Sequence, residues 1–294
     1  MKRTSAAARP RIIKTLQILR GAVANYRASG ESIALVPTMG ALHEGHLALI
    51  RAARRKADRV IVSIFVNPTQ FAPGEDFQTY PRTFEADLAA LTKLNTEIVW
   101  APPTEVMYPK AFATKIEPAG PAVVGLEDAI RPHFFGGVAT VVTKLLTQCL
   151  PDYAMFGEKD YQQLRVVTQT TQDLNLPMRI IGVPTVREKD GLAMSSRNVY
   201  LTPDQRQTAP TLYRVLKFCC EKIAEGRPIA SILSEGREAI ERAGFALDYL
   251  EARHAENLGP ISSLNDGPVR LLVAAKIGAT RLIDNMGVKA ARGL

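Results

Sequence analysis

The sequence predicts an α/β fold, in which a doubly wound, Rossmann-like parallel sheet is followed by a smaller C-terminal α+β domain. Short apolar runs alternate with amphipathic helical stretches from residue 31 to about residue 184, which is typical of a parallel sheet. The segment 33–66 forms a strand–helix–strand unit by itself. After Thr185 the pattern changes to two helices and then short strands joined by Gly, Pro and Asn turns. We therefore expect a nucleotide- and substrate-binding domain over 1–184 and a smaller domain over 185–294.

The elements follow in order from apolar periodicity. The run 33–36 ends at Pro37 and predicts a buried strand, and the run 60–66, which stops at Asn67-Pro68, predicts a second one. The remaining strands of the sheet are predicted over 98–100, 153–156 and 179–183. Helices are predicted over 42–57, 84–94, 138–149, 160–173, 203–225 and 228–243. The last three strands are predicted over 245–255, 269–277 and 281–285.

The composition indicates an ordinary soluble globular protein. Of 294 residues, 46% are hydrophobic and 22% are charged, and no apolar stretch reaches membrane-spanning length, so we expect no membrane partner. Three cysteines without metal-like spacing argue against a disulfide framework or a zinc site. A reducing, cytoplasmic location fits best.

Positive charge is spread along the chain. The first 14 residues are basic and lack an apolar h-region, which favours a short disordered lead-in over a transit peptide. The formal charge of +8 permits nucleic-acid binding and equally suits small polyanions such as ATP. The basic run 51–56 is spread along a predicted helix, which is typical of a solvated face, so we expect no nucleic-acid partner.

The sharpest motif is His43-Glu-Gly-His46, where the first strand leads into a helix. Backbone N–H groups and the helix dipole favour an anion at such a helix start. The two histidines are three residues apart and share one face of the helix, and Gly45 lets a phosphate approach the backbone. Two imidazoles there can donate hydrogen bonds to nucleotide phosphates. A pair of surface histidines and a metal site are weaker alternatives, because no further ligand lies nearby in sequence.

Three more polar segments are candidates for the same site. Lys159 follows a strand end and could reach a phosphate, while Asp160 could accept from a ribose hydroxyl, although Gly-Glu-Lys-Asp alone is a common turn with a helix cap. Ser195-Ser196-Arg197 offers short donors and a planar cation for a triphosphate, although it could equally be a capping loop. Gln70 could bind a hydroxy acid, although Asn-Pro-Thr-Gln alone is only a turn. In an open α/β sheet such loops gather at the carboxyl ends of the strands.

Taken together, the segments 37–49, 62–71, 80–87, 156–163 and 183–201 resemble the pantothenate synthetase family. The HxGH element alone marks the wider nucleotidyltransferase superfamily, whereas its combination with Phe-Gly-Glu-Lys-Asp-Tyr-Gln-Gln and Met-Ser-Ser-Arg-Asn is far more specific. The resemblance implies an ATP-dependent ligase that adenylates pantoate and transfers the pantoyl group to β-alanine. It also implies Mg²⁺ with the ATP, no covalent cofactor, and a homodimer.

The resemblance also implies roles for individual residues. His43, His46, Lys159 and Arg197 would be catalytic, Gln70 and Gln163 would hold pantoate, and Asp87 would lie on the magnesium side. The ATP-binding residues would be Met39, Gly40, His46, Gly157, Lys159, Asp160, Val186, Met194, Ser195, Ser196 and Arg197. Adenylation itself needs no protein nucleophile, because the carboxylate is the attacking group.

The sequence departs from the family pattern in one place. The family usually reads Arg-Pro-x-His-Phe, but here the stretch is Arg131-Pro132-His133-Phe134-Phe135, so the histidine stands one position early. Neither His133 nor Phe134 is therefore expected to be catalytic. Also, Ala86 stands where some relatives carry an acidic neighbour of Asp87.

Two other functions are consistent with parts of the pattern. Another nucleotidyltransferase would act on a phosphorylated acceptor, and only the ligase should show pantoate-dependent exchange of pyrophosphate into ATP. A non-catalytic nucleotide- or RNA-binding module would show salt-dependent RNA binding without ATP turnover.

Overall fold

The computed structural model describes residues 9–72 and 74–289, which divide between two compact units. The first unit draws on Met1–Ala119, Arg131–Gly157 and Val166–Val183, and the second on Gly120–Ile130, Glu158–Arg165 and Pro184–Leu294. Two short segments that precede residue 184 thus pack within the second unit. The division into functional domains at residue 184 stays a prediction.

The first unit is built on a six-stranded parallel sheet with the strand order β1-β4-β3-β2-β5-β6. Its strands are β1 Arg11–Ile13, β2 Ile33–Thr38, β3 Arg59–Ile64, β4 Ile98–Trp100, β5 Tyr153–Gly157 and β6 Arg179–Val183. Strand β2 pairs with β3 on one side and with β5 on the other. Strands β3 and β4 therefore extend the sheet on one side of β2, and β5 and β6 extend it on the other. The predicted doubly wound sheet is confirmed, and β2 marks its topological switch point.

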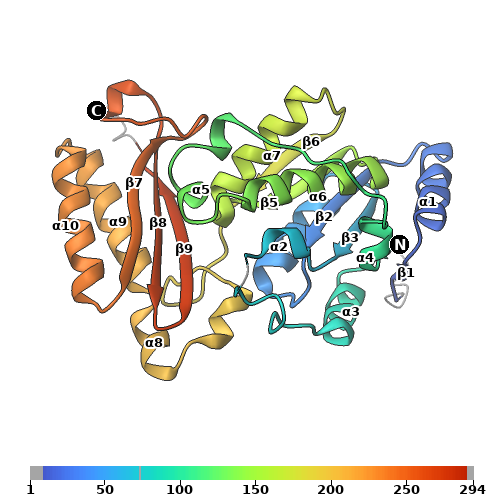
Figure 1. Cartoon of the computed structure of the whole chain (residues 1–294), viewed down its shortest axis with the longest axis horizontal. Helices are drawn as coiled ribbons and strands as arrows, with labels where there is room; N and C mark the ends of the chain where they lie inside the picture. The colour runs from blue at the N-terminus through green and yellow to red at the C-terminus, as the bar shows by residue number, and fades with distance from the viewer. Residues whose placement is uncertain (1–8, 73, 290–294) are drawn as a thin grey trace, which may run out of the picture. The chain divides into compact units, whose positions relative to one another are not determined.

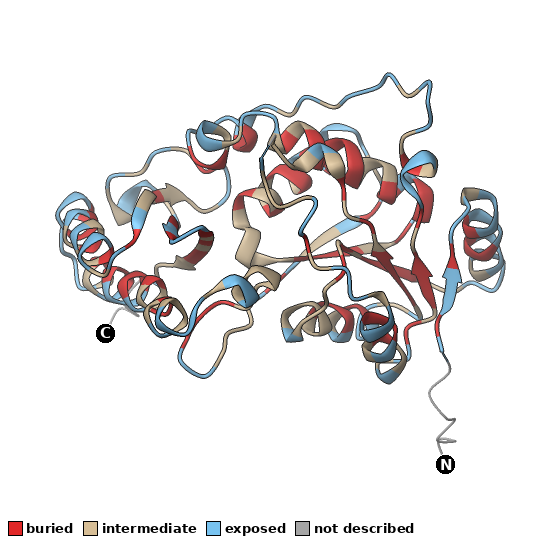
Figure 2. Ribbon diagram, turned by 60° about the horizontal axis from the view of Figure 1, so that its bottom comes forward, coloured by how far each residue is buried: buried red, intermediate tan, exposed pale blue. Residues whose placement is uncertain are grey.

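Helices lie on both sides of this sheet (Figure 1). They are α1 Leu16–Ala28, α2 Glu44–Arg54, α3 Phe84–Lys93, α4 Thr104–Met107, α6 Phe134–Cys149 and the greater part of α7 Tyr161–Asp173. The strands in the middle of the sheet are buried, as Figure 2 shows, and the apolar side chains of Val36, Val62 and Val99 pack in one cluster with Ile50 of α2. Burial on both faces explains the continuous apolar runs in the sequence.

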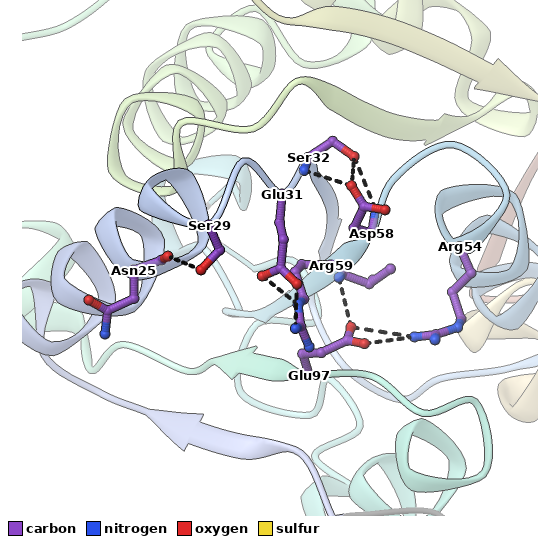
Figure 3. A network of polar contacts seen from close by, with 9 residues as sticks. Asn25, Ser29, Glu31, Ser32, Arg54, Asp58, Arg59 and Glu97 are labelled. Atoms are coloured by element: carbon purple, nitrogen blue, oxygen red, sulfur yellow. Dashed lines mark hydrogen bonds and ion pairs between the residues drawn. The ribbon is translucent and has the colours of Figure 1, made fainter. Parts of the chain in front are cut away.

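Polar contacts join the amino ends of the strands (Figure 3). The backbone N–H of Ser32 and its hydroxyl donate to Asp58 Oδ2 at 2.9 and 2.6 Å, and the hydroxyl contact holds the pKa of Asp58 below its usual range. Glu97 accepts from the backbone N–H of Val60 at 2.8 Å and from Arg54 at 3.1 Å. The Arg54 guanidinium thus pairs with a carboxylate at the amino ends of the strands, and the loops described below lie at their carboxyl ends.

The second unit contains a three-stranded antiparallel sheet, β7-β8-β9. Its elements are α5 Glu127–Ile130, α8 Pro203–Thr208, α9 Thr211–Ala224, α10 Ile229–Arg242, β7 Ala246–His254, β8 Val269–Ile277 and β9 Thr280–Gly287. An apolar core joins Leu216 of α9, Ile232 of α10 and Val273 of β8. The predicted smaller α+β part with an antiparallel sheet is confirmed.

The segment 120–130 is joined to this sheet by a buried ion pair. Arg281 Nη1 and Nη2 donate to the carboxylate of Glu127 at 2.9 and 2.8 Å, and Tyr249 Oη donates to the same group at 2.9 Å. Burial lowers the pKa of Arg281, but the hydrogen bond and charge of Glu127 and the hydrogen bond of Asp248 outweigh it and hold that pKa above its ordinary value. Removing one partner of such a pair leaves an uncompensated buried charge.

Several predicted elements were wrong in detail. The single helix predicted over 203–225 is two helices, α8 and α9, with Pro210 between them because proline cannot continue a helix. Helix α6 begins at Phe134 rather than at residue 138. Of the predicted disordered lead-in, Arg11–Ile13 is strand β1 and pairs with β4, whereas residues 1–8 lie outside the described part.

None of the helices within 9–72 and 74–289 has the length and apolarity needed to cross a membrane.

Candidate active site

The loop after β2 and the start of α2 bring His43 and His46 together. His43 is the N-cap of α2 in extended backbone, and its Nδ1 accepts from the Gly45 N–H at 3.1 Å. In return, His46 Nδ1 accepts from the His43 N–H at 3.3 Å, and the ring centroids are 4.1 Å apart. The two imidazoles form a reciprocal capping box, in the positions usually held by Ser or Thr and by Glu or Gln.

This capping arrangement fixes how the two rings present their donors. An Nδ1 atom that accepts a hydrogen bond carries no proton, so the proton of the neutral ring is on Nε2. Both neutral histidines therefore carry their proton on Nε2 at the N-terminus of α2, where the helix dipole attracts negative charge. The motif is suited to stabilising an anion on which charge develops.

The backbone of the loop before His43 is held by Asp87, near the start of α3. The Asp87 side chain is 3% exposed, Oδ2 accepts from the Ala41 N–H at 3.0 Å, and Oδ1 accepts from the Leu42 N–H at 2.9 Å. Thr83 Oγ1 also donates to Oδ1 at 3.1 Å. Gly40 has φ +83°, and a Cβ there would lie 3.1 Å from Asp87 Oδ2, so a side chain at this position would crowd the carboxylate.

The predicted magnesium role of Asp87 stays a prediction. Both carboxyl oxygens accept from backbone N–H groups, and an ionised carboxylate has further lone pairs beyond these two contacts. Among the residues that the structure describes, no group of three or more His, Cys, Asp or Glu side chains could hold a metal ion. The two backbone contacts also suit Asp87 to shaping the loop from which His43 projects.

The loop after β3 carries Gln70, which is held by Asn67. Asn67 is 1% exposed, and its Nδ2 donates to Gln70 Oε1 at 3.0 Å and to the Gly137 carbonyl at 3.3 Å. Tyr108 Oη donates to Asn67 Oδ1 at 2.8 Å, and burial raises the pKa of Tyr108, so the phenol stays a donor. With its carbonyl oxygen engaged, the Gln70 amide has its NH₂ end left to donate to a ligand oxygen.

Asn67 is a functional candidate that the sequence-based assignment of site residues missed. The only signal was a polar residue between a strand end and Pro68, which is also the signal of a simple turn. Helix α6 closes on this turn so tightly that a Cβ on Gly137 would lie 2.4 Å from the Thr69 carbonyl oxygen. The position of Gln70 is thus set by α6 as well as by Asn67.

The segment after β5 belongs to the second unit from Glu158 onward. Lys159 lies in the short 3₁₀ helix η3 Glu158–Asp160, and its Nζ lies 3.9 Å from Asp160 Oδ1. Of the two adjacent amides that follow, Gln162 is buried and its Nε2 donates to the Pro121 carbonyl at 2.9 Å. Gln163, by contrast, is half-buried.

The predicted triphosphate segment also lies in the second unit. Ser195 is the N-cap of the 3₁₀ helix η4 Ser196–Tyr200, and its Oγ accepts from the Arg197 N–H at 3.2 Å. Before it, Met194 N–H donates to the Val186 carbonyl at 3.0 Å, which brings the two predicted adenine neighbours together. The Ser195 side chain therefore caps a helical turn, and the triphosphate role of the segment stays a prediction.

His133 and Phe134, which stand where the sequence departs from the family pattern, make none of the contacts described above. His133 is exposed at the N-cap of α6 and makes no side-chain capping bond. The Arg131 guanidinium lies 3.9 Å from the centroid of the Phe134 ring, which also packs on Phe135. Phe134 thus contributes packing and a cation–π contact.

The predicted site residues divide between the two units. Loops at the carboxyl ends of β2, β3 and β5 in the first unit carry Met39, Gly40, His43, His46, Gln70 and Gly157. The second unit carries Lys159, Asp160, Gln163, Val186, Met194, Ser195, Ser196 and Arg197.

Comparison with known proteins identifies the family. A family model described as pantoate–β-alanine ligase matches residues 11–287. Pantothenate synthetase of Nitrobacter winogradskyi is 62% identical over 279 residues, which is 95% of this chain and 99% of the relative, and that of Rhodopseudomonas palustris is 61% identical over the same shares.

Solved structures agree with this likeness. Pantothenate synthetase from Thermus thermophilus superimposes with a TM-score of 0.90 at 46% identity, over 95% of this chain and 99% of that one. The enzyme from Francisella tularensis, solved with β,γ-ATP and β-alanine, gives a TM-score of 0.80 at 35% identity, over 95% and 97%. With the HxGH capping box in place and this likeness along nearly its whole length, the chain belongs to the pantoate–β-alanine ligase family.

Proposed function

We propose that this chain is an ATP-dependent ligase that condenses pantoate with β-alanine to pantothenate, releasing AMP and pyrophosphate. The family match along residues 11–287 and the relatives named pantothenate synthetase support the overall reaction. The ATP and β-alanine named in the Francisella tularensis structure support these two substrates.

The reaction proceeds in two transfers. A pantoate carboxylate oxygen attacks the α-phosphorus of ATP, and the bond from that phosphorus to the bridging oxygen breaks, so that pyrophosphate leaves and pantoyl adenylate forms. The free amine of β-alanine then attacks the acyl carbon, loses a proton and expels AMP. The protein must orient two anions and stabilise a pentacovalent phosphate, and it supplies no covalent nucleophile.

The observation that carries the proposal is the reciprocal capping box of His43 and His46. Because each Nδ1 accepts from a backbone N–H, each neutral ring carries its proton on Nε2, at a helix N-terminus. We assign these donors to the phosphate oxygens of ATP, whose negative charge increases as pyrophosphate leaves.

The remaining roles follow the family resemblance and the local contacts. We propose that Lys159, Ser195, Ser196 and Arg197 neutralise the triphosphate. Gly157 and Asp160 would hold the ribose, and the backbone-paired Val186 and Met194 would flank the adenine. Met39 and Gly40 would contact ATP from the loop after β2, while Gln70 and Gln163 would bind the pantoate oxygens with their amides.

We propose that Mg²⁺ enters with the ATP and that Asp87 lies on the magnesium side of the site. A triphosphate carries Mg²⁺ through its own oxygens and bound water, and such an ion needs few protein ligands.

We further propose a cytoplasmic homodimer whose smaller domain, 185–294, closes over ATP. Sedimentation analysis tests the dimer, and small-angle scattering with and without a non-hydrolysable ATP analogue tests the closure.

One assay tests the proposed function directly. The protein is incubated with ATP, Mg²⁺ and labelled pyrophosphate, with and without pantoate, and label entering ATP is measured. Pantoate-dependent exchange is expected, followed by AMP release that also requires β-alanine. Exchange that needs a phosphorylated acceptor instead of pantoate would reassign the chain to another nucleotidyltransferase activity.

Replacing Gly137 by alanine is expected to damage pantoate binding more than ATP binding. The new Cβ would press on the Thr69 backbone, which cannot retreat without moving Gln70. Overpacking of this kind costs about 1–3 kcal/mol of stability. We expect a KM for pantoate raised about tenfold, in line with about 1.4 kcal/mol, and a lower denaturant midpoint.

The neighbouring glycine provides the matched control. A Cβ on Gly136 would approach nothing closer than 3.6 Å, so Gly136→Ala should keep both KM values and the midpoint. Equal effects of the two substitutions would show that helix α6 does not set the position of Gln70.

A further inference from the structure

Two consecutive polar residues on β9, Asp284 and Asn285, are nearly fully buried. They are 5% and 3% exposed, and the other buried residues of the strand are Thr280 and Leu282. Successive side chains of a strand point to opposite faces of the sheet. One strand therefore presents a polar contact to each face, and each contact reaches a segment that the proposed function uses.

Asn285 holds the backbone on both sides of Lys159. Its Nδ2 donates to the Glu158 carbonyl and to the Lys159 carbonyl, each at 2.8 Å. Its Oδ1 accepts from Arg270 Nε at 2.7 Å, which fixes the orientation of the amide. Arg270 Nη2 donates in turn to the Glu158 carboxylate at 3.2 Å, and its guanidinium lies 4.0 Å from the centroid of the Tyr161 ring.

Asp284 holds the turn that precedes the serine–arginine segment. Its carboxylate accepts from Arg187 Nη1 at 2.6 Å and Nη2 at 3.0 Å, and Arg187 Nη1 also donates to the Gly191 carbonyl at 3.1 Å. Gly191 has φ +95°, and a Cβ there would lie 2.1 Å from the Tyr213 ring. The turn 187–193 is therefore tightly packed, and it leads directly into Met194-Ser195-Ser196-Arg197.

The two residues are also joined to each other. The Asn285 N–H donates to Asp284 Oδ1 at 2.7 Å, and both residues lie opposite residues of β8, the middle strand of the antiparallel sheet. All these contacts lie within the second unit. The strand thus fixes the backbone of Lys159 relative to the turn before Ser195.

We propose that Asp284 and Asn285 are positioning residues for the adenylation step, which keep Lys159 and the Ser195–Arg197 segment in the relative arrangement that a triphosphate requires. This inference rests on the proposed function, because that function gives both segments their role. Donors that stabilise developing charge must be held to within a fraction of an ångström, and the stem of a lysine is flexible, so its backbone must be fixed. A strand that pairs along its length with the middle of the sheet provides that rigidity.

The test is the pyrophosphate-exchange rate of Asn285→Ala with pantoate present. Loss of the two donors should lower kcat about 10- to 100-fold, the size of effect that a displacement of about 1 Å produces. The control is Leu282→Ala on the same strand, which removes core packing and leaves the hydrogen bonds of Asn285 in place. It should lower the thermal midpoint at least as much and leave kcat within about twofold. Equal losses of kcat in the two variants would overturn the inference.

A double-mutant comparison separates positioning from general destabilisation. If Asn285 acts through Lys159, Asn285→Ala should have no further effect in a Lys159→Ala background. Asp284→Asn should likewise be non-additive with Arg197→Ala. Fully multiplicative effects would contradict the proposal. Should Asn285→Ala not fold, Arg270→Met removes the group that orients Asn285 and is expected to behave in the same way.

Failure of the proposed function would be recognised separately. In that case the unmodified protein would show no pantoate-dependent exchange at all. The positioning claim is then tested by the Kd for MgATP, which Asn285→Ala should raise and Leu282→Ala should not.

Discussion

Substituting His43 by asparagine or His46 by glutamine will leave the protein folded and lower pantoate-dependent pyrophosphate exchange about 10²- to 10³-fold. Asparagine is a good N-cap and glutamine is the usual capping-box partner, so each substitution retains the acceptor that the backbone N–H requires. What is lost is the Nε2–H donor, because in each ring the Nδ1 atom accepts from the backbone. The measurement is the exchange rate at saturating ATP and pantoate.

Alanine at the same positions gives the comparison. His43→Ala loses the donor and the cap together, so we expect the same loss of exchange and an additional loss of about 0.5–2 kcal/mol in unfolding free energy. An unchanged exchange rate in His43→Asn would show that this histidine serves only the helix start. The pair of substitutions thus divides the two functions that one imidazole combines.

Much of the fold could be predicted because apolar periodicity is a local property. The buried strands β2 and β3 and the helix between them were visible in the sequence, as was the change of pattern near Thr185. Strand β1 was missed because three residues at a sheet edge carry little signal. Helix α1 was missed although Leu19, Ala22 and Val23 have helical spacing.

The ends of helices were less predictable where residues of low helix propensity lie inside a helix. Gly136 and Gly137 discourage a helix, and the prediction for α6 accordingly began at residue 138. The close approach of Gly137 to the Thr69 backbone explains why glycine stands there despite this cost. Pro210, by contrast, was an available signal for the break between α8 and α9.

The candidate site was predicted where one segment carries its own chemistry. The spacing of His43 and His46 placed their rings together, as the structure has them. The contacts of Asn67, Asp87 and Asn285 could not be read from the sequence, because each joins segments far apart in the chain. For a buried carboxylate such as Asp87, residue type alone does not distinguish a metal ligand from an acceptor of backbone N–H groups.

Substituting Asp87 by asparagine is expected to lower exchange about 10²-fold, as a displacement of about 1 Å in the HxGH loop would. The asparagine fits the space but replaces one acceptor by an NH₂ group that faces a backbone N–H. Leaving a buried donor unsatisfied costs about 1–3 kcal/mol, so the unfolding free energy should fall by that amount. Denaturant unfolding and exchange kinetics measure the two effects.

The dependence on magnesium decides between the two roles of Asp87. If the carboxylate only shapes the loop, the Mg²⁺ concentration for half-maximal exchange in Asp87→Asn should equal that of the unmodified protein while the maximal rate falls. If Asp87 binds the ion, this concentration should rise and excess Mg²⁺ should restore the rate. Thr83→Val is the control, because it removes one hydrogen bond to Asp87 Oδ1 and leaves both backbone contacts. It should reduce the rate much less, since Ala41 and Leu42 still bind the carboxylate and hold the chain that leads to His43.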